Sequence, residues 1–150
     1  MTVPADRRMA DRRMTDRRMT EVCGTEALWL LEGSDQGRLV YIQREVAVVR
    51  PAAHVMEYGS LIVRAPIQAA TLPGRALLAY QADEIRTPAG TGWTVTAQGP
   101  AEVISDPDEA AHYRRTLPGW AHGPHDTLLR LRPQSLSGFR LARTANGAGR

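Results

Sequence analysis

The segment WTVTAQGPAEVI, from Trp93 to Ile104, decides the fold class of this chain of 150 residues. It is long for a strand, its first half alternates threonine or glutamine with apolar residues, and Gly99-Pro100 interrupts it near the middle. Alternation with a period of two predicts a half-buried strand, and proline inside a strand marks an edge or a bulge. We therefore expect one long strand that bends at Gly99-Pro100, as the strands of small barrels do.

Six other segments have the composition of strands, because they are rich in β-branched, aromatic or alternating apolar residues. Pro51 lies inside one of them, so we expect an edge position or a bulge there. A turn at residues 57–60 predicts that the strands on either side of it form a hairpin. The expected strands are 38–42, 45–56, 61–64, 76–85, 127–132 and 138–142.

Helical signals are confined to a few places. Residues 25–33 open with Thr25, a capping residue, and close with glycine. Residues 105–117 open with a cap, a proline and two acids, and residues 65–75 allow a helical turn. Helices this sparse do not form repeated βαβ units. We expect a mainly β (α+β) fold, with a small antiparallel barrel and short helices packed outside it.

An arginine-rich segment accounts for the net charge of the chain. Residues 1–20 hold six arginines and three aspartates, whereas the rest of the chain holds 13 arginines and 13 acidic residues. The sequence pI of about 9.6 therefore comes from this segment. Because the remaining body is neutral, we expect no nucleic-acid partner.

The same segment is a repeat, ADRRM-ADRRM-TDRRM, over residues 5–19. Its methionines recur every five residues, so on a helix they would spiral around the axis instead of forming the apolar stripe that a membrane or partner helix needs. We expect residues 1–22 to be a mobile arginine-rich tail, with a binding role as the alternative. Residues 23–143 would then form one domain, and residues 144–150 a flexible C-terminal tail.

Other features limit the location and the chemistry of the protein. No run approaches the roughly 18 apolar residues that span a bilayer, so we expect no membrane partner. Cys23 is the single cysteine, which fits a reducing cytoplasm. The pair in His122-Gly-Pro-His125 has no nearby cysteine, so we expect no metal site. Nucleophile elbows, phosphate loops and dinucleotide fingerprints are absent from the sequence, and no catalytic residue is assigned.

Seven segments, in this order, resemble the flavin-binding split barrels related to pyridoxamine 5′-phosphate oxidase, and especially their short actinobacterial members. The resemblance implies a six- to seven-stranded antiparallel split β-barrel with Greek-key topology and flanking short helices. It also implies a homodimer, with two flavin mononucleotide (FMN) sites in grooves at the subunit interface. The segments are GRLVY (37–41), VVRPAAH (48–54), LIVRA (61–65), LLAYQADEI (77–85), GWTVTAQGPAEVISDPDEAAHY (92–113), GWAHGPHD (119–126) and LLRLRPQSLSGFRL (128–141).

The resemblance assigns the cofactor phosphate to Arg64, because a phosphate dianion favours a planar bidentate donor. Ala65 occupies the next position, where many members have a threonine or serine that adds a hydroxyl donor. Many members also have a lysine within the following loop, whereas residues 66–71 contain none. Gln68 or Thr71 could take over part of that role.

The resemblance places the other cofactor contacts on the ring side of the flavin. Arg50, Pro51 and His54 match the strand that runs under the ring. Trp93 matches a tryptophan that lines the groove, with the barrel core as its alternative place. Trp120 lies on the connection that approaches the partner subunit, where it would contact the ring or the interface.

Three functions follow from the resemblance. The first is an FMN-dependent oxidoreductase that acts on a small flat substrate at the dimer interface, where the cofactor supplies the redox chemistry. The second is a non-catalytic protein that binds or sequesters a flavin, which the missing lysine and hydroxyl favour. The third is the same barrel with a deazaflavin or haem.

Overall fold

The protein is described by a computed structural model over residues 16–72, 76–120 and 122–143. Within these residues the chain is mainly β, with eight strands and two α-helices. In chain order the elements are β1 (Arg17–Glu21), α2 (Gly24–Glu32), β2 (Gln36–Gln43), β3 (Val46–Glu57), β4 (Ser60–Ala65), the 3₁₀ turn η1 (Ala69–Thr71), β5 (Ala76–Arg86), β6 (Thr91–Val103), α3 (Pro107–Thr116), β7 (Thr127–Leu131) and β8 (Ser135–Arg143).

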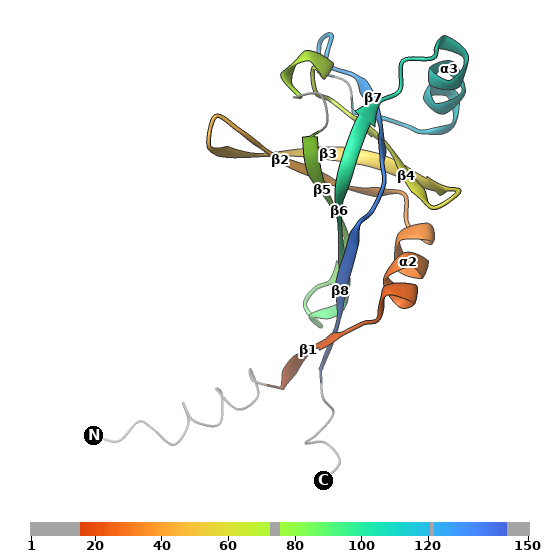
Figure 1. Ribbon diagram of the computed structural model, residues 1–150. Coiled ribbons are helices and arrows are strands. Elements are labelled where there is room, and N and C mark those ends of the chain that lie inside the picture. Colours follow the sequence, from red (N-terminus) through yellow and green to blue (C-terminus); the bar gives the residue numbers. More distant parts are fainter. Residues whose placement is uncertain (1–15, 73–75, 121, 144–150) are drawn as a thin grey trace.

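All strand pairs are antiparallel, and six strands close into a ring. The ring runs β6-β5-β2-β3-β4-β7 and returns to β6, while β8 and then β1 extend the sheet away from β6. The β1–β8 ribbon projects from one end of the barrel, with α2 beside it (Figure 1). The predicted split-barrel-like fold is confirmed. The ring itself has six strands, within the six to seven expected for the barrel. Of the eight strands in the described residues, β1 is the one that was not predicted.

The bend predicted at Gly99-Pro100 is the point where β6 changes its neighbour. Residues 92–98 of β6 pair with β8, and residues 101–103 pair with β7. A Cβ atom on Gly99 would lie 1.9 Å from the carbonyl oxygen of Arg132, so only glycine permits this approach. This glycine therefore lets one strand belong to both the ring and the projecting ribbon.

Strand β3 also changes neighbours along its length. Residues 46–53 pair with β2 and residues 53–57 pair with β4, so Ala53 is the only residue of β3 with a partner on both sides among the described strands. Pro51 lies in the section with one partner, which confirms the predicted edge position. The second edge of this section presents backbone groups that no described strand pairs.

The core is divided into a cluster inside the ring and a smaller cluster beneath α3. Helix α2 contributes Ala27 and Leu31 to the first cluster, both with 0% exposure. Helix α3 contributes Ala110 and Tyr113 to the second. Each helix thus packs on a different cluster of the core. None of the helices in the described residues has the length and apolar character required to cross a bilayer.

Both α-helices begin at capping residues. The Sγ of Cys23 accepts from the N–H of Glu26 at 3.4 Å, so α2 begins one residue before the expected cap at Thr25, and that prediction is wrong. Cys23 takes the role because its backbone is extended at the helix entry. At α3, the carboxylate of Asp106 accepts from the N–H of Glu109 at 2.9 Å.

Part of the predicted mobile tail is a strand. Residues Arg17–Glu21 pair in register with Arg143–Phe139 of β8, so the prediction of a mobile tail is wrong for this segment. All five side chains of β1 are exposed, and the segment is held by backbone pairing, which requires no apolar pattern. The remaining tail predictions fall on residues 1–15 and 144–150, which lie outside the described residues.

Candidate functional site

Arg64, the expected phosphate ligand, is engaged within the protein. Its Nε and Nη2 donate to the two carboxylate oxygens of Asp126 at 2.9 and 3.0 Å. Its Nη1 donates to the carbonyl oxygens of Leu117 and Arg114 at 2.6 and 3.2 Å. Four of the five N–H groups of this guanidinium therefore have protein acceptors.

Asp126 also joins a second arginine. The Nε of Arg114 donates to its carboxylate at 3.4 Å, and the Nη2 of Arg114 donates to its backbone carbonyl at 3.2 Å. Hydrogen bonding from Arg64 holds the pKa of Asp126 below its usual value, and the same contact raises the pKa of Arg64. Asp126 and Arg64 are therefore both charged at neutral pH. We call Arg64, Arg114 and Asp126 the Arg64 cluster.

The surroundings of Arg64 do not fit a phosphate dianion. Ala65 is 1% exposed and has no hydroxyl group. Thr71, a predicted substitute donor, already donates its hydroxyl to the carbonyl oxygen of Gln68 at 2.7 Å. One N–H of Arg64 remains, and it lies beside the carboxylate of Asp126, which would repel a phosphate. The phosphate role of Arg64 therefore stays a prediction that the observed contacts oppose.

Two predicted ring contacts meet in a hollow of about 270 Å³. Pro51 comes from the one-partner section of β3, and Trp120, which is 54% exposed, comes from the connection after α3. Arg38 and Asp83 form an ion pair of 2.8 Å there, and neither was among the predicted site residues. We call this the Trp120 hollow, and its lining is Gln36, Gly37, Arg38, Pro51, Asp83 and Trp120.

His54 is inside the barrel, which opposes the prediction that it contacts a cofactor. It is 1% exposed. Its Nδ1 lies 2.6 Å from the hydroxyl of Tyr80, and its Nε2 lies 3.0 Å from the carbonyl oxygen of Leu31. Both ring nitrogens are thus paired with protein groups. The side chain joins β3 to β5 and to the end of α2.

These contacts define the protonation of the pair. Because a carbonyl only accepts, Nε2 of His54 donates to Leu31 and Nδ1 accepts the hydroxyl proton of Tyr80. Burial lowers the pKa of His54, and burial raises the pKa of Tyr80. Both side chains are therefore neutral near pH 7, and the pair serves as a buried structural contact.

The other predicted residues are spread over the molecule. Trp93 is 9% exposed and belongs to the core cluster inside the ring, which was its alternative place. One side of it lines a separate hollow of about 530 Å³ beside α2 and β8. Arg50 is exposed and donates to the carbonyl oxygen of Val49 at 2.9 Å. Of the predicted set, only Pro51 and Trp120 line one hollow.

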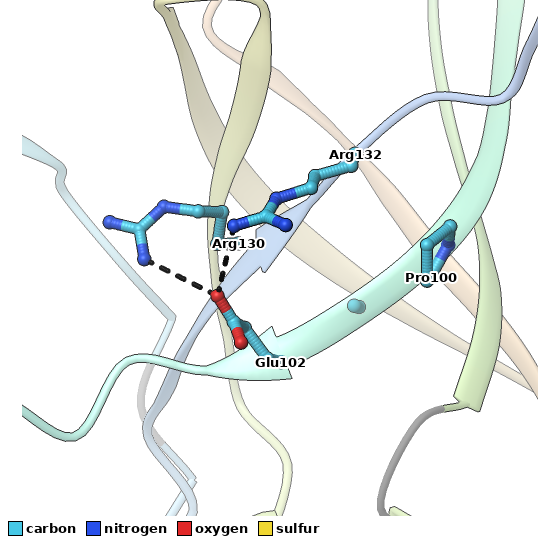
Figure 2. Close-up of a pocket in the computed structure, with 5 residues that line it drawn as sticks. Pro100, Glu102, Arg130 and Arg132 are labelled. Atoms are coloured by element: carbon cyan, nitrogen blue, oxygen red, sulfur yellow. Dashed lines mark ion pairs between the residues drawn. The ribbon is translucent and has the colours of Figure 1, made fainter.

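A second group of arginines was missed by the sequence reasoning. Figure 2 shows dashed lines that join Glu102 to both Arg130 and Arg132. The Nη–Oε1 distances of these ion pairs are 3.7 and 3.6 Å. Arg130 also pairs with Glu109 of α3. The hollow at this group has a volume of about 190 Å³. Period-two spacing in the segment LRLR was the available signal, because it places both arginines on the same face of a strand.

Residues 122–125 bring two histidines together without a third ligand. The ring centroids of His122 and His125 lie 5.8 Å apart. Over residues 16–72, 76–120 and 122–143, no group of three potential ligands is positioned to hold a metal ion. The Nδ1 of His125 is buried and has no hydrogen-bond partner among those same residues.

Comparisons with known proteins extend the structural result. The family model described as "Pyridoxamine 5'-phosphate oxidase" matches residues 25–140. The uncharacterized protein Rv0080 of Mycobacterium tuberculosis is 31% identical over 123 residues, which cover 77% of this chain and 81% of that protein.

Solved structures share the fold at lower identity. An FAD binding protein from Mycobacterium smegmatis has a TM-score of 0.61 and 22% identity, covering 83% of this chain and 98% of its own. An FAD-binding protein from Mesorhizobium loti has a TM-score of 0.60 and 16% identity, covering 85% and 99%. With the match of the family model over most of its length, this chain belongs to the pyridoxamine 5′-phosphate oxidase family.

Proposed function

We propose that this protein binds a flavin with the ring system in the Trp120 hollow. The observation that carries the proposal is the meeting of Pro51 and Trp120 in one hollow, beside the edge of β3 that lacks a second described partner. An exposed indole offers a flat apolar surface for a flavin ring, and unpaired backbone groups offer hydrogen bonds to its polar edge. Two structural neighbours are named as FAD-binding proteins, which supports a flavin as the ligand class.

A homodimer would complete this site. Ile42 and Leu77 are 67% and 72% exposed and line one hollow of about 400 Å³. Val49 is 48% exposed and lies opposite Val40, on the sheet face that also carries Ile42. Apolar side chains gathered in this way favour burial against a second surface. A second copy seated here would also cover the neighbouring edge of β3.

For the chemistry, we propose a flavin-dependent oxidoreductase that acts on a small flat substrate. A bound flavin supplies the electron transfer, and the protein supplies binding, orientation and exclusion of water. A non-catalytic flavin carrier is the second candidate. It is favoured by the Trp120 hollow itself, because the charged side chains in its lining, Arg38 and Asp83, are paired with each other.

Flavin titration tests the proposal. We expect riboflavin fluorescence to be quenched on binding, and Trp120→Ala to weaken the affinity about two- to tenfold, which corresponds to the loss of one stacked aromatic contact. Trp29→Ala is the matched control, because Trp29 is 71% exposed on α2 and lies outside the lining of the hollow. The absence of quenching with riboflavin, FMN and FAD would contradict flavin binding. A haem or deazaflavin absorbance band in the purified protein would favour those cofactors instead.

Catalysis and assembly need separate measurements. Sedimentation velocity should give a dimer, and Leu77→Asp should shift it toward the monomer. If the protein is an oxidoreductase, a small flat acceptor should reoxidise the protein-bound reduced flavin faster than it reoxidises free reduced flavin. Equal rates for free and bound flavin would favour the carrier.

A further inference from the structure

We infer that Asp126 is an internal anion that takes the place of a ligand phosphate at Arg64. The carboxylate meets Nε and Nη2 in a bidentate arrangement, with distances of 2.9 and 3.0 Å. Arginine binds carboxylate and phosphate through this same geometry. An anion from solution would therefore compete with Asp126 for one set of donors.

The carboxylate is covalently part of the protein, and the surrounding chain holds it in place. Carbonyl oxygens of Leu117 and Arg114 accept from Nη1 of Arg64, which ties β4 to the end of α3. Gly119 lies directly on the arginine, because a Cβ atom there would be 2.6 Å from Cδ of Arg64. The side chains of Arg64 and Asp126 are only 17% and 27% exposed. Release of Asp126 would thus leave two donors of a largely buried arginine without their acceptors.

Removal of the Asp126 carboxylate would change the net charge of the Arg64 cluster. Two arginines face one aspartate, so the cluster carries a single surplus positive charge. Replacement of Asp126 by asparagine keeps the shape and raises the surplus to two. Two arginines with free donors form a site for phosphate, because charge-assisted bonds from guanidinium are strong.

What the inference implies for the choice between riboflavin and FMN rests on the proposed flavin function. With Asp126 in place, a flavin gains nothing from a phosphate at Arg64, so the wild-type protein should bind riboflavin and FMN with affinities within about twofold of each other. Asp126 thus determines cofactor specificity by excluding a phosphate contact. Asp126→Asn should bind FMN about tenfold more tightly than riboflavin.

The test uses the full chain and two independent probes. FMN and riboflavin are titrated by fluorescence quenching, and inorganic phosphate is titrated by thermal shift. Glu102→Gln is the matched control, since it also removes a carboxylate shared by two arginines. We expect phosphate to raise the Tm of Asp126→Asn and to leave the wild type and Glu102→Gln unchanged. In Glu102→Gln the response should be absent because Arg130 stays paired with Glu109 and the side chain of Arg132 is 68% exposed.

Each outcome decides the inference. A wild-type preference for FMN of tenfold or more, or equal phosphate stabilisation of wild type and Asp126→Asn, would overturn it and leave flavin binding standing. If no flavin binds to any variant, the proposed function fails and the phosphate comparison alone decides the role of Asp126. If Asp126→Asn does not fold, the wild type is compared with Arg64→Gln, and a phosphate response lost in Arg64→Gln would overturn the inference.

Discussion

The contact between Tyr80 and His54 gives the sharpest prediction for stability. Tyr80 is 0% exposed and His54 is 1% exposed, and their hydrogen bond of 2.6 Å joins β5 to β3 within the ring. Tyr80→Phe removes one oxygen and leaves the rest of the side chain in place. Nδ1 of His54 then remains buried without its donor.

The expected cost follows from these two losses. A neutral hydrogen bond contributes about 1 kcal/mol net, and a buried polar atom left without a partner brings the total to about 2 kcal/mol. Removal of the hydroxyl opens almost no cavity, so packing adds little. For a chain of this size, about 2 kcal/mol corresponds to a fall in Tm of roughly 4–8 °C.

Urea unfolding followed by tryptophan fluorescence measures the change. The midpoint should fall while the m value stays constant, because the surface exposed on unfolding is the same. Tyr41→Phe is the matched control. Tyr41 is 7% exposed, and among the described residues no hydrogen bond is recorded for its hydroxyl, so we expect a change of less than about 0.5 kcal/mol. Equal effects of the two substitutions would refute the reasoning.

Two further predictions concern pH and the projecting ribbon. The pKa of His54 is lowered in the folded state. As the pH falls, the unfolded chain therefore takes up a proton at this histidine before the folded chain does. The free energy of unfolding is thus at its full value above about pH 6.5 and falls by up to about 1.4 kcal/mol per pH unit below it. Urea midpoints at pH 7.5, 6.0 and 5.0 should show this slope, with His54→Gln flattening it and His112→Gln, exposed on α3, retaining it. Deletion of residues 1–15 should leave the Tm unchanged, whereas deletion of residues 1–21 should cost about 1 kcal/mol, because it removes the strand paired with β8. Equal Tm values for the two deletions would show that β1 adds nothing.

The barrel could be predicted because its signals are local. Alternation in Trp93–Ile104 and the bend at Gly99-Pro100 belong to one strand, and the structure uses both as expected. The strand within the repeat could not be predicted in this way. Its side chains are all exposed, and its contacts are backbone pairing and a hydrogen bond from Arg17 to the carbonyl oxygen of Pro88. Such contacts leave no mark in the pattern of apolar residues.

The site was harder to predict because its contacts are distant in sequence. Arg64 and Asp126 are separated by 62 positions, and no local pattern shows that they meet. The burial of His54 was missed for a different reason. Ala52, Ala53 and His54 are buried in succession because β3 changes neighbours there, so a period of two could not assign the face of the histidine. Pro51 and Trp120 were each singled out by the family resemblance, and their meeting in one hollow joins distant segments that no local pattern connects.

The position of β1 has a consequence for how the gene can vary. Every pentad ends in DRRM, and β1 uses only the last of the three copies. Loss or gain of one whole copy upstream would present β8 with an unchanged partner of the same sequence. A change in copy number would alter the length and charge of the N-terminal segment while leaving the strand register untouched. The sheet therefore tolerates variation in the number of copies ahead of β1.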